Sequence, residues 1–258
     1  SQNYKNNYIE IEDFGDLTVF KKFQKKSINK KIYYKKILNL LIKIKNIKTK
    51  YQKTFLKTNY KVPDYSLKKL LDESNLFLDW YLPKHVKRGK NRILKIKFNK
   101  IFKKLLNNIY YKNKVFVHRD FHISNLMITK KGLGLIDSQD AVYGNIAYDL
   151  ASLIDDVRFK TDVKTKKYIF DEFIKKNKQL NLKKFKNDFE ILSVLRNLKI
   201  IGIFTRLSVR DKKNQYLKLI PYAWDLIDYR TLNNPIFKDL NYLLSKNFDR
   251  KIRKSYEN

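Results

Sequence analysis

The strongest structural signal in this chain is the stretch VFVHRDFHISNLM at residues 115–127, followed by LIDSQDA at residues 135–141. It sets Asp120 and Asn125 in a loop between two β-favouring runs and Asp137 at the end of a third run. Phosphoryl transfer needs a carboxylate that takes the proton of the acceptor hydroxyl, and hard oxygen ligands that hold Mg²⁺ against the phosphates of ATP. The spacing therefore predicts Asp120 as a catalytic base and Asn125 and Asp137 as ligands of Mg²⁺.

Each of these residues also has a plainer interpretation. A single Asp in a loop at the end of a strand is usually a turn residue, and only the joint spacing favours a catalytic Asp120. His118 and Arg119 are part of that spacing, and we expect them to have structural roles near the site. His122 lies inside the same loop, but no second His or Cys is placed to complete a metal site, so we expect it to pack locally.

The rest of the chain has mainly helical periodicity. Residues 8–12 alternate apolar and acidic side chains, which predicts a short strand that needs a partner from elsewhere in the chain. Short β-favouring runs occupy 115–117, 126–129 and 133–136. Apolar residues at helical spacing predict helices over 32–47, 67–81 and 93–110, with Pro83 ending the second and 84–91 forming a connector. Further helices are expected over 150–157, 166–177, 185–204, 216–227 and 235–244.

The net charge of the 258-residue chain is +33, which raises nucleic-acid binding as a first hypothesis. Of its 58 basic residues, however, 48 are Lys and only 10 are Arg, and the Lys residues accompany abundant Asn, Ile and Tyr. Arg is the residue that grips phosphates and bases bidentately, whereas paired Lys residues suit solvated helix faces. We therefore expect a small-molecule substrate rather than nucleic acid, while the oligomeric state stays open.

The composition also bears on the compartment. The chain has no Cys, which excludes disulfides and favours a reducing compartment, so the cytoplasm is expected. No apolar run is long enough for a membrane span, and the first residues have no signal-peptide pattern. The single Met is Met127, so we expect a chain that is truncated at its N-terminus.

The string HRDFHISNLMITKKGLGLIDSQDAVYGNIAYDLASLIDDVR at residues 118–158 resembles the aminoglycoside phosphotransferase and choline kinase superfamily. Within it, the motifs HRDF, NLM and YDLASL are most similar to those of the bacterial N-acetylmuramate/N-acetylglucosamine anomeric kinases. The resemblance extends more weakly to LFLDWYL at residues 76–82 and to IEDFGD at residues 11–16.

This resemblance implies an α+β, protein-kinase-like fold in which the N-terminal β-lobe is largely missing. Residues 1–16 would be a remnant of the small lobe and the hinge, and residues 17–258 the large, mostly helical catalytic lobe. The implied reaction moves the γ-phosphate of ATP to a hydroxyl of an amino sugar, as in the recycling of peptidoglycan sugars.

The resemblance also implies roles for individual residues. Asp120 would act on a sugar hydroxyl, and the backbone of Glu10, Ile11, Glu12 and Asp13 would meet adenine at the hinge. Asp149 would cap or anchor the helix that follows it rather than contact the substrate. Candidates for the acceptor pocket are Gln139, Asp79 and Trp80.

The sequence departs from the family pattern at several points. Ser138 replaces a Phe of the anomeric kinases, and Asn145 replaces a Pro. No phosphate-covering loop or strand Lys precedes residue 11, so we expect weak nucleotide binding and little or no activity from this chain. An aminoglycoside, choline or another hydroxyl compound is an alternative acceptor. An inactive kinase-like remnant that acts as a binding module is an alternative of another class.

Overall fold

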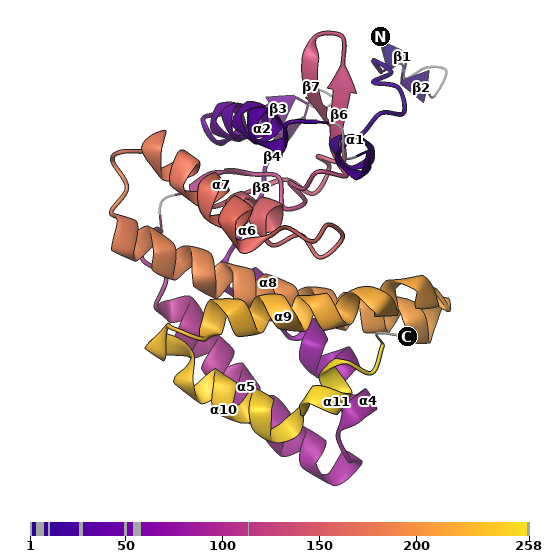
Figure 1. The fold of residues 1–258 in the computed structure, drawn as a ribbon, viewed down its shortest axis with the longest axis vertical. Coiled ribbons are helices and arrows are strands. Elements are labelled where there is room, and N and C mark those ends of the chain that lie inside the picture. Colours follow the sequence, from indigo (N-terminus) through magenta and orange to yellow (C-terminus); the bar gives the residue numbers. More distant parts are fainter. Residues whose placement is uncertain are drawn as a thin grey trace.

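The computed structural model describes residues 2–3, 8–9, 11–25, 28–48, 51–53, 58–112 and 114–256 (Figure 1). Helices make up most of the described structure, and short antiparallel strand pairs lie toward one end of it. The predicted α+β class with a mostly helical body is therefore confirmed.

Two strand pairs frame the predicted catalytic segment. The end of β5 (Lys114–Val117) pairs with the start of β8 (Val142–Asn145), and the start of β6 (Leu126–Thr129) pairs with the end of β7 (Gly132–Leu135). The strands at 115–117 and 126–129 were predicted, the third is shifted by one residue, and β8 was not predicted. In this register Val117 lies opposite Val142, and Leu126 lies opposite Leu135. The loops 118–125 and 136–141, which connect these residues, therefore lie in one region.

The N-terminal segment runs alongside the β6–β7 hairpin. Leu17 accepts a 2.8 Å hydrogen bond from the backbone N–H of Ile128, and the aromatic ring of Phe14 covers Gly134 so closely that a Cβ there would lie 2.7 Å from it. The predicted strand over 8–12 is shorter than expected. It forms only β2 (Tyr8–Ile9), and its partner is the adjacent β1 (Gln2–Asn3) rather than a distant segment.

The first half of the chain supplies five α-helices to the described structure, and two predictions about residues 83–91 are wrong. Pro83 does not end a helix, because it lies in the first turn of α4, where a missing N–H costs no hydrogen bond. The expected connector 84–91 is helical from residue 88 onward. The elements are α1 (Val19–Gln24), α2 (Lys30–Lys45), β3 (Tyr51–Lys53), β4 (Asn59–Lys61), α3 (Leu67–Ser74), the π-helix η2 (Phe77–Tyr81), α4 (Leu82–His85) and α5 (Arg88–Asn107).

The second half is helical after β8, as predicted. The long helix α8 (Leu182–Asp211) is buried on nearly all sides and packs along α9 (Ile220–Thr231), as Figure 1 shows. The other elements are α6 (Tyr148–Ile154), α7 (Val163–Lys175), the 3₁₀ turns η3 (Asn214–Leu219) and η4 (Pro235–Phe237), α10 (Lys238–Asn247) and α11 (Arg250–Arg253).

Close packing joins α8 to η2. A Cβ on Gly202 of α8 would lie 2.3 Å from the carbonyl carbon of Leu76, so only glycine permits this approach of the two backbones. Beside this contact, Phe77 packs edge-on against Trp224, and the indole N–H of Trp224 donates to the hydroxyl of Tyr81 at 3.2 Å. The hydrophobic core therefore lies within the helical body, and the strand pairs are placed on its edge.

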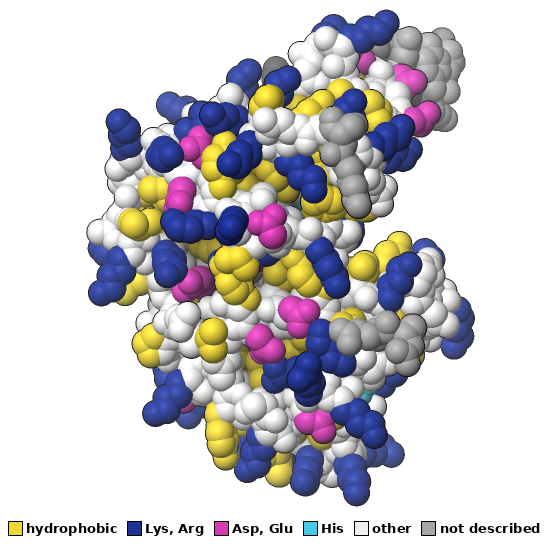
Figure 2. Space-filling view, in the orientation of Figure 1, with side chains coloured by type: hydrophobic (Ala, Val, Ile, Leu, Met, Phe, Trp, Pro, Cys, Tyr) yellow, Lys and Arg dark blue, Asp and Glu magenta, His cyan; other side chains and the backbone are white. Residues whose placement is uncertain are grey.

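The charged side chains on the surface are distributed as expected for solvated helix faces. On the face shown in Figure 2, Lys and Arg side chains are scattered over most elements and are interspersed with Asp, Glu and apolar side chains. Across the described residues, every helix is too short or too polar to cross a membrane.

Candidate active site

The loop between β5 and β6 holds Asn125 against Asp120. The side-chain amide of Asn125 donates to the backbone carbonyl of Asp120 at 3.1 Å, and its backbone N–H donates to the carbonyl of His122 at 2.9 Å. Because the amide nitrogen is engaged, the Oδ1 atom of Asn125 is left as the free end, and no described residue donates a hydrogen bond to it. This is the orientation that a metal ligand requires.

The loop after β7 is attached directly to the first loop. The backbone N–H of Ile136 donates to the carbonyl of Asn125 at 3.1 Å, and the Nε2 atom of His118 lies 3.0 Å from the carbonyl oxygen of Ile136. The next residue, Asp137, has a left-handed backbone with a φ of +69°, and its Oδ1 accepts a 2.6 Å hydrogen bond from Gln139. Gln139, which was predicted for the acceptor pocket, therefore lies in contact with Asp137.

Asp149 holds the loop that carries the predicted base. Its carboxylate accepts hydrogen bonds from the backbone N–H groups of His118, at 2.7 Å, and Arg119, at 2.9 Å. Asp149 was expected to cap or anchor its own helix. It does not cap α6, whose N-cap is Ala147, but its two hydrogen bonds attach that helix to the loop. Burial raises the pKa of Asp149 to about 7, although the two backbone donors favour its charged form.

Arg119 connects the loop to helix α3. Its guanidinium donates to the carboxylate of Glu73 at 2.6 Å and to the backbone carbonyl of Asp140 at 3.2 Å. Glu73 also accepts a 2.8 Å hydrogen bond from Lys199 of α8 and another from the hydroxyl of Tyr65. Burial alone would raise the pKa of Glu73, but the charges of Lys199 and Arg119 hold it below its ordinary value.

Sequence reasoning missed Glu73 and Lys199. One signal was available for Glu73: it lies three residues after the buried Leu70 on the same helix face, where a carboxylate needs a partner. Nothing in the local sequence of α8 marks Lys199 as that partner.

The predicted base is surrounded by cations. Burial alone would raise the pKa of Asp120, but the positive charges of Arg196 and Lys199, both on α8, outweigh it and hold that pKa below its ordinary value. Arg196 is only 4% exposed, and sequence reasoning missed it. Asp120 is therefore ionised at neutral pH, and its carboxylate accepts no hydrogen bond from any described residue.

Two of the predicted acceptor-pocket residues do not join this group. Asp79 is exposed and forms a 2.9 Å ion pair with Lys95 of α5. Trp80 is partly buried in η2. Within the described parts of the chain, neither side chain has a hydrogen bond or ion pair with the 118–125 loop.

The predicted hinge lies beside the β6–β7 hairpin, and Glu10 is outside the described residues. Ile11 is 81% exposed, and Glu12 forms a 3.1 Å ion pair with Lys131 at the hairpin turn. Asp13 accepts a 2.7 Å hydrogen bond from the backbone N–H of Gly15, which has a φ of +70° and closes the predicted turn. Contact of this segment with adenine stays a prediction.

The donor set fits a magnesium ion held against phosphates. Mg²⁺ in such sites takes one or two carboxylates, with phosphate oxygens and water completing the octahedron. Asn125 offers its Oδ1 and Asp137 its Oδ2, and neither oxygen has a hydrogen-bond partner among the described residues. The side chain of His122, in the same loop, is only 4% exposed, and burial lowers its pKa to about 4. Among the residues that the structure describes, no cluster of three or more His, Asp or Glu side chains is suited to a metal ion.

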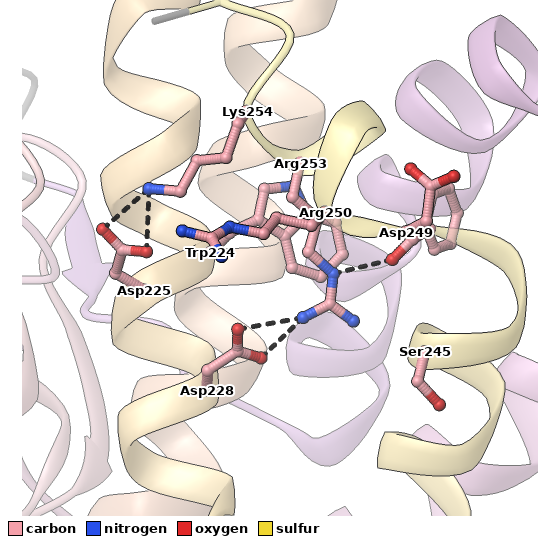
Figure 3. Close-up of a pocket in the computed structure, with 9 residues that line it drawn as sticks. Trp224, Asp225, Asp228, Ser245, Asp249, Arg250, Arg253 and Lys254 are labelled. Atoms are coloured by element: carbon pink, nitrogen blue, oxygen red, sulfur yellow. Dashed lines mark hydrogen bonds and ion pairs between the residues drawn. The ribbon is translucent and has the colours of Figure 1, made fainter.

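A separate surface pocket of about 500 Å³ lies at the C-terminal end of the helical body (Figure 3). The guanidinium of Arg253 lies 4.6 Å from the ring of Trp224 and donates to both carboxylate oxygens of Asp228, at 2.7 and 2.9 Å. Lys254 pairs with Asp225 at 3.0 Å. These four charged side chains are paired with one another, and the ion pairs attach the C-terminal segment to α9. The pocket is therefore not the candidate active site.

The helical body and the two linked loops have the arrangement of a kinase-like fold. Residues 56–174, which include both loops and Glu73, match the model of the phosphotransferase enzyme family. The solved structure of an ethanolamine kinase from Plasmodium vivax has the same fold, with a TM-score of 0.52 at 12% identity over 81% of this chain and 61% of that chain. The expected kinase-like fold is confirmed.

The chain is also similar in sequence to curated bacterial kinases. The chain is 35% identical over 169 residues to the N-acetylmuramate/N-acetylglucosamine kinase of Neisseria meningitidis serogroup B, which covers 62% of this chain and 50% of that protein. It is 28% identical over 190 residues to the kinase of the same name from Pseudomonas aeruginosa, which covers 71% and 56%. The chain spans about half the length of the curated relatives it matches.

Proposed function

We propose that the protein transfers the γ-phosphate of ATP to a hydroxyl of an amino sugar of the N-acetylmuramate or N-acetylglucosamine type. The family match supports phosphotransfer, and the names of the curated relatives support the amino sugar. The observation that carries the proposal is the hydrogen bond from the amide of Asn125 to the carbonyl of Asp120, because it ties the proposed metal ligand to the proposed base.

Asp120 is the base in this proposal. The hydroxyl of the sugar donates its proton to the Asp120 carboxylate while the hydroxyl oxygen bonds to the γ-phosphorus. The bond between that phosphorus and the β–γ bridging oxygen breaks, and ADP leaves with the bonding pair. Asp120 is ionised at neutral pH and has no competing hydrogen bond from the described residues, so it is free to receive the proton.

Asn125 and Asp137 are the proposed ligands of Mg²⁺, through Oδ1 and Oδ2 respectively. A bound Mg²⁺ neutralises the charge of the phosphates. The hydrogen bond from Gln139 engages the Oδ1 atom of Asp137 and leaves Oδ2 as the proposed ligand atom. We further propose that residues 10–13 contact adenine, since residues 11–17 run alongside the β6–β7 hairpin that connects the two loops.

The test is a phosphotransfer assay on the full-length gene product. Labelled ATP and Mg²⁺ are offered with N-acetylmuramate, N-acetylglucosamine, an aminoglycoside, choline or ethanolamine. We expect label in one or both amino sugars and a loss of about 10²- to 10⁴-fold in kcat for Asp120→Asn. Asp140→Asn is the matched control, because Asp140 is an exposed carboxylate nearby and contacts Arg119 mainly through its backbone.

Two results would contradict the proposal. Transfer to none of the acceptors would favour a kinase-like binding module without activity. An Asp120→Asn variant as active as the wild type would show that the loop geometry has no catalytic meaning.

A further inference from the structure

The guanidinium of Arg119 joins both candidate loops. Arg119 itself belongs to the loop 118–125, and its Nη1 atom donates to the backbone carbonyl of Asp140, in the loop 136–141, at 3.2 Å. Its Nη2 atom donates to the Oε1 atom of Glu73 at 2.6 Å. One rigid, planar group therefore connects the loop of the proposed base, the loop of a proposed metal ligand and helix α3.

Glu73 is held from several sides, so it can anchor Arg119. Its Oε2 atom accepts a 2.8 Å hydrogen bond from Lys199 of α8 and another from the hydroxyl of Tyr65. The side chains of Glu73, Arg119 and Lys199 are only 14%, 14% and 13% exposed. Removing one partner from such a group leaves a buried charge uncompensated, which is costly. The position of the guanidinium is therefore set by α3 and α8 together.

The loop of Asp137 needs support from outside itself. Asp137 has a φ of +69°, and a left-handed backbone is unfavourable for a residue with a side chain unless its surroundings hold it. On one side of Asp137, the backbone N–H of Ile136 donates to the carbonyl of Asn125 at 3.1 Å. On the other side, Arg119 donates to the carbonyl of Asp140. The bond from Arg119 therefore attaches the second side of this loop.

We propose that Arg119 is a positioning residue that sets the separation of Asp120 and Asp137, the proposed base and metal ligand. Glu73 is its anchor. This inference rests on the proposed function. Arg119 directly precedes Asp120, so a shift of its guanidinium changes the position of one loop relative to the other. Catalysis of phosphoryl transfer is almost entirely positioning and charge stabilisation, and a misplacement of about 1 Å can cost about 10²-fold in rate.

The first experiment measures kcat and KM separately in the full-length gene product, with an amino sugar as acceptor. Arg119→Gln should lower kcat by about 10- to 100-fold and change the KM for the sugar by less than about threefold, because both arms of the fork are engaged within the protein. Glu73→Gln should act in the same direction. Arg253→Gln is the matched control, because Arg253 is also 14% exposed and paired with a carboxylate, that of Asp228, but lies at the C-terminal pocket. It should lower the Tm without changing kcat.

Hydrogen exchange gives a second readout that needs neither a ligand nor activity. In Arg119→Gln the backbone amides of residues 136–141 should exchange at least about tenfold faster relative to those of α7, because this loop has lost a charge-assisted hydrogen bond. Arg119→Lys keeps the positive charge opposite Glu73 and should fold. It should show a smaller acceleration, since a single ammonium replaces the two-armed fork. Arg253→Gln should leave the ratio of the two rates unchanged.

Unchanged exchange of residues 136–141 in both Arg119 variants would overturn the inference. A lower Tm with an unchanged kcat would also overturn it, because Arg119 would then support only the fold. If Arg119→Gln does not fold, Arg119→Lys decides both readouts alone. Transfer to no acceptor by the wild type would contradict the proposed function instead. In that case the exchange ratio decides the inference: faster exchange of 136–141 in the variants supports it, and an unchanged ratio overturns it.

Discussion

The carboxylate of Asp149 accepts a 2.9 Å hydrogen bond from the backbone N–H of Arg119, which lies in a left-handed conformation with a φ of +74°. Such a backbone is unfavourable for a residue with a side chain and persists only where the surroundings hold it. Asp149 provides that support from helix α6, together with its bond to His118. The position of Asp120, the next residue, therefore depends on a helix that follows later in the chain.

We expect Asp149→Asn to lower both stability and activity. An amide offers one acceptor where the carboxylate offers two, so at least one buried N–H of the loop loses its partner. The free energy of unfolding should fall by about 1–3 kcal/mol, measured by urea denaturation. In the phosphotransfer assay kcat should fall more than KM rises, because the base is displaced. Asp171→Asn, in an exposed pair with Lys167, is the control and should behave like the wild type.

Gly202→Ala should disrupt the helical body. The new Cβ would lie 2.3 Å from the carbonyl carbon of Leu76, and backbone atoms cannot move aside as a flexible side chain does. We expect a loss of at least about 3 kcal/mol, as for severe overpacking, or a failure to fold. Gly89→Ala is the matched control, because a Cβ there meets no atom within 4 Å and alanine favours the helix by up to about 1 kcal/mol. Equal melting temperatures for the two variants would contradict this account of the α8–η2 contact.

Asp155→Asn should be strongly destabilising. Its buried carboxylate accepts from Lys166 at 2.8 Å, from Arg230 at 2.7 and 3.0 Å, and from Ser193 at 2.6 Å. Neutralising it leaves two buried cations without their counter-charge, which typically costs about 3–5 kcal/mol. Asp225→Asn, in a more exposed pair with Lys254, should cost no more than about 1 kcal/mol. The comparison of urea midpoints checks both values, and similar midpoints would speak against a structural role for the Asp155 cluster.

His85→Phe should reduce the acid sensitivity of the fold. The imidazole packs at a tilt of 40° against the ring of Tyr81, with 4.3 Å between the ring centroids, and burial, helped by the charge of Lys84, lowers its pKa to about 4. The unfolded chain, with an ordinary pKa near 6.5, takes up a proton first, so stability is complete above about pH 6.5 and is lost as pH falls toward 4. Phe keeps the ring contact without titrating.

The measurement is the free energy of unfolding at pH 7 and at pH 5 for the wild type and for His85→Phe. The difference between the two pH values should be smaller in the variant. Some acid sensitivity should remain, because the pKa values of His118 and His122 are lowered as well. Identical differences in the two proteins would show that His85 does not contribute to the pH dependence.

Much of the secondary structure could be predicted because its determinants are local. The amphipathic pattern over 32–47 corresponds to α2 within two residues at each end, since one apolar face is enough to specify such a helix. The strand β8 was missed because VYGN contains Gly and Asn, which have low strand propensity. It is a strand because β5 provides its hydrogen-bonding partner.

In the candidate site, too, only the residues with local determinants could be predicted. Asp120, Asn125 and Asp137 could be nominated from spacing alone, because two short loops and one hairpin connect them. Glu73 and Arg196 could not be nominated in this way. The role of Asp149, which supports the loop rather than capping its own helix, could not be predicted either. Periodicity shows which face of a helix is buried, but it does not show which distant charge that face will meet. Ionic partners 46 or 126 residues apart, such as those of Glu73, are selected only when the helices pack and remove water from between them.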